Sequence, residues 1–170
     1  MTSSPILFSE QQRFRQPWLW ILLAGLNTFT AYALVQQLYF HQPVGTNPMS
    51  DAGFLPVCLL ILGLDALFIF MRLDVQIQTD GVYYRFFPLQ RNYRMISRGR
   101  ISRAWVREYS PLKEYGGWGM RLGIFGKGQA FNVRGNKGLQ LVYDNDVMFL
   151  LGTQKPEALK EALDTLGWPQ

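Results

Sequence analysis

The chain has 170 residues, a formal net charge of +5 and a single cysteine and histidine, Cys58 and His41. This length allows one domain of about 100–150 residues together with an additional segment. One cysteine and one histidine exclude an intrachain disulfide and a Cys/His metal cluster, and any catalytic pair that needs a histidine would depend on His41. The composition therefore predicts neither an enzyme nor a bound metal or cofactor.

Residues 1–16 are predicted to form a cytoplasmic segment that precedes the first apolar run, residues 17–40. As a helix this uncharged run would measure about 36 Å, which exceeds the ~30 Å hydrocarbon core of a bilayer. Arg13 and Arg15, followed by Trp18–Leu26 and the small residues Ala31–Ala33, also match a signal peptide. The apolar run continues past that cleavage motif to Phe40, which favours a transmembrane helix.

A second apolar run, residues 54–71, would form a helix of about 27 Å, just long enough to span a bilayer. The loop between the runs, residues 41–53, contains neither Lys nor Arg, whereas Arg13, Arg15 and Arg72 flank the two runs on their other sides. The positive-inside rule then places both termini in the cytoplasm and residues 41–53 outside. The sequence predicts a transmembrane hairpin with both ends on the cytoplasmic side.

Asp65 is an ionisable residue within the second predicted span, where an unpaired charge is costly. Asn27 falls at a comparable depth on the first span, and Gly25 and Gly63 would allow the helices to approach closely. We expect these four residues to form a contact between the two helices. A role for Asp65 in transport or in contacts between copies of the chain is the alternative.

Residues 72–170 are predicted to form a cytoplasmic β domain. Leu73, Val75 and Ile77 alternate with polar residues, and Asp80-Gly81 predicts a hairpin turn into a strand at residues 82–87. Short segments bounded by Gly, Pro, Asn or Asp predict further strands. These lie at residues 93–97, 101–108, 118–122, 130–134, 139–143 and 147–151. The spacing indicates an antiparallel meander or barrel of about seven or eight strands.

The last element is a predicted amphipathic helix at residues 155–166, which begins near Pro156 and ends before Gly167. Leu159, Ala162, Leu163 and Leu166 form its apolar stripe. A curled antiparallel sheet capped by such a helix is the architecture of a pleckstrin-homology-like (PH-like) barrel.

Three segments strengthen this interpretation: YGGWGMR (residues 115–121), AFNVRGNKGLQLVY (130–143) and LLGTQKPEAL (150–159). Together they resemble a family of bacterial PH-like domain membrane proteins. The resemblance implies two N-terminal transmembrane helices in a bacterial inner (plasma) membrane, followed by a PH-like barrel. It transfers no catalytic residues to this chain.

The glycine-rich segment at residues 113–138 does not match a nucleotide-binding loop. A Walker motif ending at Gly126-Lys127 requires glycine at Arg121 and a hydroxyl residue at Gly128, and a dinucleotide fingerprint requires glycine at Leu122. Turns at residues 123–128 and 135–138, with Gly and Asn in positive-φ positions, explain the glycines instead.

Basic residues dominate from Arg72 onward, where 15 Lys and Arg face 9 Asp and Glu, a net charge of about +6. This excess fits positive-inside topology, a site for anionic lipid headgroups or an acidic protein partner, while no recognised motif favours nucleic acid. For a headgroup site we selected the cations in and beside the predicted turns, Arg121, Lys127, Arg134 and Lys137. The sequence thus predicts a non-enzymatic membrane protein that binds anionic lipid or a protein partner. The alternative is a structural or assembly subunit that oligomerises through the hairpin and barrel.

Overall fold

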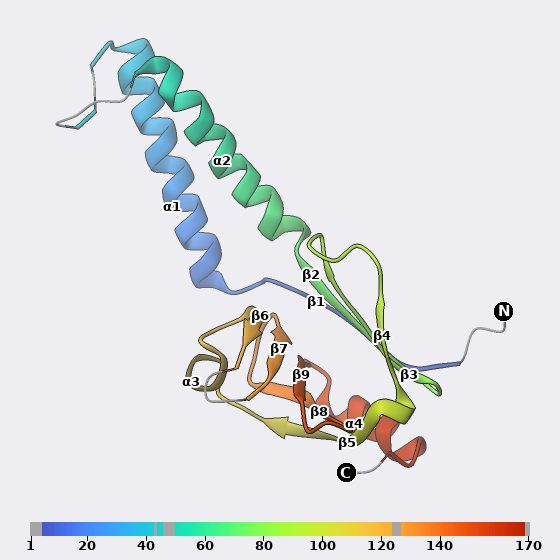
Figure 1. The fold of residues 1–170 in the computed structure, drawn as a ribbon. Coiled ribbons are helices and arrows are strands. Elements are labelled where there is room, and N and C mark those ends of the chain that lie inside the picture. Colours follow the sequence, from blue (N-terminus) through green and yellow to red (C-terminus); the bar gives the residue numbers. More distant parts are fainter. Residues whose placement is uncertain (1–4, 43, 46–49, 124–126, 169–170) are drawn as a thin grey trace. The chain divides into compact units, whose positions relative to one another are not determined.

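The computed structural model describes residues 5–42, 44–45, 50–123 and 127–168 (Figure 1). The chain divides into two compact units, one formed by residues 15–70 and the other by the residues up to Phe14 together with Met71 onward. The N-terminal segment therefore belongs to the β domain, although 56 residues of the helical unit separate it from the rest of that domain in sequence.

The helical unit confirms the two predicted apolar helices. Helix α1 (Pro17–Leu34) continues into a π-helical segment, η1 (Val35–Tyr39), and α2 spans Asp51–Phe70. Both are long and apolar enough to cross a membrane. Their large side chains point outward: Ile21 is 71% exposed and Leu60 is 73% exposed. Exposed apolar surfaces of this kind mark sites of contact with a membrane or with another protein.

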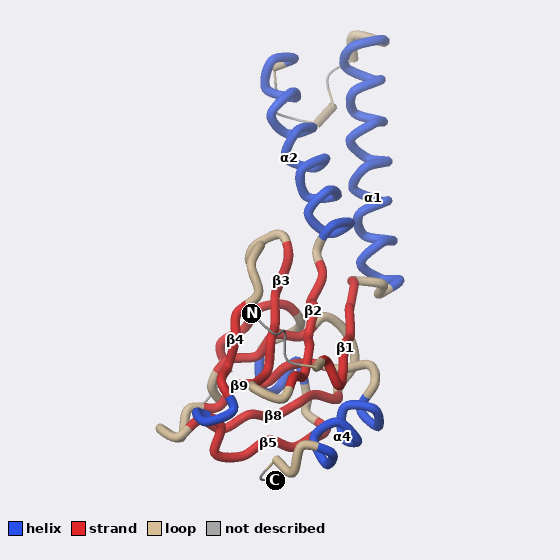
Figure 2. Tube along the Cα trace, turned by 90° about the vertical axis from the view of Figure 1, so that its right-hand side faces the viewer, coloured by secondary structure: helices blue, strands red, loops and turns tan. Residues whose placement is uncertain are grey.

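The first sheet contains four antiparallel strands in the order β1-β2-β3-β4 (Figure 2). Their bounds are β1 Ile6–Arg13, β2 Arg72–Gln78, β3 Gly81–Phe87 and β4 Arg94–Ser97. Strands β2 to β4 confirm the prediction, whereas β1 was not predicted. Two of its inward-facing residues, Glu10 and Gln12, are polar, so the usual alternation of apolar and polar residues is absent.

The second sheet contains five strands in the order β5-β8-β9-β7-β6. It is antiparallel except for the pair β7–β9, which is parallel. The strands are β5 Ile101–Glu108, β6 Gly119–Leu122, β7 Gln129–Asn132, β8 Lys137–Tyr143 and β9 Met148–Gly152. Three helical segments complete the domain: η2 (Arg98–Arg100), α3 (Pro111–Tyr115) and α4 (Pro156–Thr165).

The described strands do not form the predicted barrel, because they lie in two separate hydrogen-bonded sheets. The short 3₁₀ turn η2 separates β4 from β5, and these strands then pair with different neighbours, β3 and β8. At four residues, β4 is also too short to bridge both sheets. Consecutive strands therefore part at this corner.

The core lies between the two sheets. Tyr84 on β3 contacts Phe131 and Phe149 of the second sheet, with ring centroids 5.5 and 5.0 Å apart. Helix α4 contacts β1, β5 and β8, and Leu159 and Leu163 on its apolar stripe are fully buried. The predicted C-terminal amphipathic helix is confirmed.

The hairpin turn between β2 and β3 differs by one residue from the prediction. Thr79 and Asp80 form it, and Gly81 is the first residue of β3, paired with Gln78. A Cβ atom at Gly81 would overlap the backbone carbonyl oxygen of Ile96, so this glycine allows β4 to pack closely.

In the glycine-rich segment, φ is positive at Gly128 and Gly135, but Asn136 is not among the described residues with positive φ. In the turn at residues 135–138, glycine therefore adopts the expected left-handed conformation and asparagine does not. The centre of the predicted turn at residues 123–128 lies outside the described residues.

Candidate functional site

The four cations selected from the sequence do not meet at one point. Lys127 precedes β7 and Arg134 follows it, so they lie at opposite ends of this strand. Lys137 begins β8 at the Arg134 end, because Gly138 pairs with Gly152 at the end of β9. Arg121 is on the edge strand β6, where its Nε donates a hydrogen bond to the Trp118 carbonyl oxygen at 3.0 Å.

Lys137 lines a hollow of about 220 Å³ between β5, β8 and the start of α4. Its Nζ lies 3.8 Å from Glu108 Oε1, and Glu157 and Lys160 line the opposite wall. Three cations and two carboxylates line the hollow, so it offers little net charge to attract an anion.

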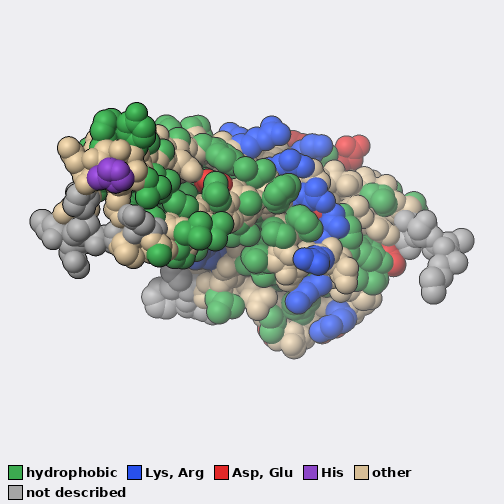
Figure 3. Space-filling view, turned by 90° about the horizontal axis from the view of Figure 1, so that it is seen from above, with side chains coloured by type: hydrophobic (Ala, Val, Ile, Leu, Met, Phe, Trp, Pro, Cys, Tyr) green, Lys and Arg blue, Asp and Glu red, His purple; other side chains and the backbone are tan. Residues whose placement is uncertain are grey.

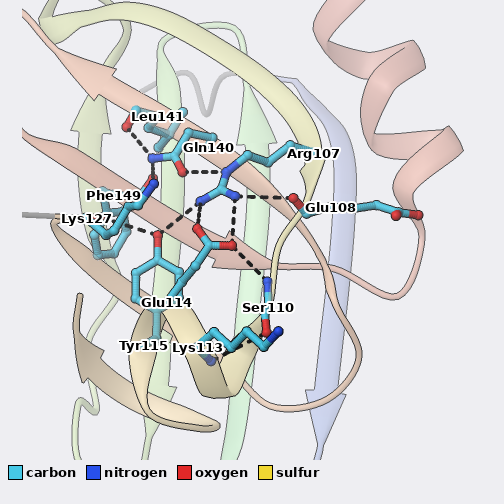
Figure 4. Close-up of polar contacts among 10 residues, drawn as sticks. All are labelled: Arg107, Glu108, Ser110, Lys113, Glu114, Tyr115, Lys127, Gln140, Leu141 and Phe149. Carbon is cyan, nitrogen blue, oxygen red and sulfur yellow. Dashed lines mark hydrogen bonds and ion pairs between the residues drawn. The ribbon is translucent and has the colours of Figure 1, made fainter. Parts of the chain in front are cut away.

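Arg107 also borders this hollow, but all five of its N–H donors are used within the protein (Figure 4). Its Nε donates to Gln140 Oε1 at 2.9 Å and its Nη2 donates to Glu114 Oε2 at 2.8 Å. The remaining bonds go to Glu114 Oε1, the Glu108 carbonyl oxygen and the Tyr115 hydroxyl. No donor remains for a ligand.

Glu114 connects this arginine to the start of helix α3. Its Oε1 accepts the Ser110 backbone N–H at 2.8 Å, while Ser110 Oγ caps the helix by accepting the Lys113 N–H. Burial alone would raise the pKa of Glu114, but hydrogen bonds from Arg107 and Ser110 outweigh it and the pKa lies below its ordinary value. This network fixes α3 to the second sheet and is structural.

A different group of cations surrounds a buried carboxylate on the outer face of the first sheet. Asp74 is 3% exposed, and its Oδ2 accepts hydrogen bonds from Arg85 Nε at 2.8 Å and Nη2 at 2.6 Å. Arg72 Nε lies 3.3 Å from the same oxygen, and Gln11 Nε2 donates to Oδ1 at 3.0 Å. Arg13 donates to Gln11 at 3.5 Å. We call these five residues the Asp74 cluster. Three guanidinium groups and one carboxylate give it a formal charge of +2.

The strand register places the Asp74 cluster at the end of the sheet that continues into the helices. Arg13 and Arg72 are direct cross-strand partners, a like-charge pair that is unfavourable unless an anion is near. Arg13 precedes Pro17 by four residues and Arg72 follows Phe70 by two. An extended chain covers at most ~3.6 Å per residue, so both arginines stay within about 15 Å of a helix end.

Figure 3 shows that Lys and Arg side chains form a nearly continuous row across one face of the domain. The sequence contributes to this asymmetry, because residues 81–107 include seven arginines and no Asp or Glu. No pattern in the sequence points to the Asp74 cluster. The cluster forms only because β1 pairs with β2, which brings Arg13 beside Arg72 although 58 residues separate them in the chain.

In the helical unit, the structure joins two of the four predicted contact residues. Asn27 Nδ2 donates a hydrogen bond to Asp65 Oδ2 at 2.9 Å and another to the Leu23 carbonyl oxygen at 2.8 Å. Gly25 and Gly63 face open space, so neither lines the contact between α1 and α2. The Asn27–Asp65 bond forms within one chain and does not require a second copy.

No family model, no curated protein and no solved structure matches this chain. Within the part of the chain that the structure describes, no three His, Cys, Asp or Glu residues are grouped to hold a metal ion. The function has to be inferred from the geometry of the chain itself.

Proposed function

We propose that the chain is a non-enzymatic protein of the bacterial inner membrane, anchored by α1 and α2 with both termini in the cytoplasm. Its β domain is a PH-like domain that binds anionic lipid headgroups at the membrane surface. Two sheets packed around one core, with a C-terminal helix against them, support the PH-like assignment. The two apolar helices support the membrane location.

The position of the Asp74 cluster is the main observation behind this proposal. Two of its arginines, Arg13 and Arg72, lie on the strands that continue into the helices, so headgroups of the adjoining leaflet are the nearest anions outside the chain. Asp74 compensates only part of the positive charge. A lipid phosphate beside Arg13 and Arg72 would relieve the repulsion between them and accept donors that Asp74 leaves unused.

Lipid retention by the full chain tests this function. The protein in detergent is titrated with phosphatidylglycerol or phosphatidylcholine, and retained lipid is counted by native mass spectrometry. The test variant is Arg13→Gln/Arg91→Gln, which removes one arginine of the Asp74 cluster and one of the connection between β3 and β4. The matched control is Arg121→Gln/Arg134→Gln, which removes the same charge from the second sheet.

A cation near an anionic surface contributes roughly 1 kcal/mol, so each lost arginine should reduce phosphatidylglycerol affinity about fivefold. We expect this loss in the test variant and little change in the control or with phosphatidylcholine. Equal losses in both variants would reduce the effect to net charge. A loss confined to the control would move the site to the second sheet.

A further inference from the structure

A short loop, residues 88–93, joins β3 to β4 at the same end of the sheet as the Asp74 cluster. Phe87, the last residue of β3, is the cross-strand partner of Arg72. Figure 2 shows this loop at the end of the first sheet where β1 and β2 continue toward the helices. The turn between β2 and β3 lies at the opposite end of the sheet.

Arg85 of the Asp74 cluster also holds the loop in place. Its Nη1 donates to the Arg91 carbonyl oxygen at 3.4 Å, and its guanidinium lies 4.5 Å from the centre of the Tyr93 ring. The Gln90 N–H donates to the Phe86 carbonyl oxygen at 2.7 Å. These bonds brace the loop from inside, while Leu89 remains 61% exposed.

The exposed side chains of the loop combine features that suit a membrane interface. An apolar leucine is accompanied by Tyr93, which is 39% exposed, and is followed by the exposed cations Arg91 and Arg94. An aromatic ring, an apolar tip and arginines without acidic neighbours favour the boundary between headgroups and acyl chains. An isolated exposed leucine would have no such meaning.

We propose that the loop at residues 88–93 inserts into the anionic leaflet, with Leu89 among the acyl chains and Arg91 and Arg94 at the lipid phosphates. The bilayer is the partner because Arg72, the neighbour of Phe87 in the sheet, is two residues from a helix that ends at Phe70. This inference rests on the membrane location proposed above and adds a third attachment point, which would fix the orientation of the domain.

Val147 provides a control position at the other end of the domain. The backbone N–H of Arg98 in η2 donates to the Asp80 carbonyl oxygen, at the Gly81 end of β3. The backbone N–H of Asp144, in the turn between β8 and β9, donates to the Arg100 carbonyl oxygen at the other end of η2. The β8–β9 turn therefore lies away from the loop. Val147 in this turn is 45% exposed, so a label there is also accessible to solvent.

The experiment places one cysteine at either position, Leu89→Cys or Val147→Cys, in the full chain with Cys58→Ala. Each is labelled with an environment-sensitive fluorophore and reconstituted into phosphatidylcholine vesicles with and without phosphatidylglycerol. Lipids with a nitroxide on the acyl chain serve as quenchers. Asn92→Cys gives a second label in the loop if Leu89→Cys does not fold.

We expect the loop label to shift to shorter wavelength and lose intensity to the quencher, while the Val147 label behaves as in water. Equal behaviour of the two labels would overturn the insertion. Quenching that does not depend on phosphatidylglycerol would support insertion while the headgroup function fails. Suppose that the loop label behaves as in water while Arg13→Gln/Arg91→Gln still loses affinity for phosphatidylglycerol. That combination would refute insertion and leave the headgroup function standing. A chain that does not float with the vesicles would refute both.

Discussion

Replacing Arg107 by methionine tests whether its network is structural. The substitution removes hydrogen bonds to Glu114, Gln140, Tyr115 and the Glu108 carbonyl oxygen. The side chains of Arg107 and Glu114 are 23% and 19% exposed, so the pair is largely but not fully shielded from water. Breaking a buried pair costs about 3–5 kcal/mol and a single charged hydrogen bond about 1.5–3 kcal/mol. We expect a loss of about 2–3 kcal/mol in the free energy of unfolding.

The assay is urea unfolding of the full chain in detergent, followed by tryptophan fluorescence in a Trp18→Phe/Trp20→Phe background. The remaining tryptophans then all report on the β domain. The control is Arg103→Met on the same strand, an exposed arginine whose guanidinium lies 5.7 Å from the centre of the Trp105 ring. We expect it to cost less than about 1 kcal/mol.

Glu114→Gln extends the test to pH. Because the folded-state pKa of Glu114 is lowered, its charge stabilises the fold above the ordinary glutamate pKa. That contribution is lost as the pH falls through the folded-state value. The stability difference between the parent and Glu114→Gln should therefore shrink in acid. Equal losses in Arg107→Met and Arg103→Met, or a difference that does not change with pH, would refute the structural role.

Three further predictions follow from individual contacts. Asn27→Leu should destabilise the hairpin by about 0.5–2 kcal/mol in an SDS titration, since it removes the bond to Asp65; an unchanged midpoint would show that this bond contributes nothing. Gly81→Ala should lower the free energy of unfolding by at least about 1 kcal/mol, and the thermal midpoint by roughly 4 °C, because its Cβ would overlap a carbonyl oxygen on β4. Gly99→Ala, with open space around its Cβ, should have little effect. Equal shifts of the two midpoints would contradict this packing. Burial raises the pKa of Tyr143 to about 12, so stability should fall as the pH rises from about 10 toward 12, and Tyr143→Phe should reduce that fall; an equal fall in both proteins would contradict this.

Local sequence patterns predicted most of the elements because their physical causes are local. The alternation in residues 73–79 and the stripe on α4 each reflect one buried face, and strands β2 to β9 and α4 appear within a few residues of their predicted bounds. Helix α3 has only five residues, too few for an apolar stripe to show.

Features that depend on distant partners could not be predicted in this way. Glu10 on β1 is buried because it accepts bonds from the Thr153 hydroxyl and the Gln154 N–H, both at 2.7 Å, more than 140 residues away. Gln12 likewise donates to the Gly152 carbonyl oxygen. Without these partners, polar residues at inward positions indicate a loop rather than a strand. The parallel pairing of β7 with β9 has no local signal either.

The candidate site also depends on residues that are distant in the sequence. The cations in and beside the turns of the glycine-rich segment were visible in the sequence, but the structure distributes them over both ends of the second sheet. The Asp74 cluster required the β1–β2 register, which joins residues on either side of the helical unit. A charge excess can be counted from sequence, whereas its concentration at one sheet end cannot.

Hydrogen–deuterium exchange of the full chain tests headgroup binding at the helix-proximal end of the first sheet most directly. The protein is compared in nanodiscs of phosphatidylcholine alone and with phosphatidylglycerol. Anionic lipid should slow exchange in residues 88–94 and around Arg72, and should leave the β8–β9 turn unchanged. Identical exchange in the two nanodiscs, or protection confined to the β8–β9 turn, would contradict the proposal.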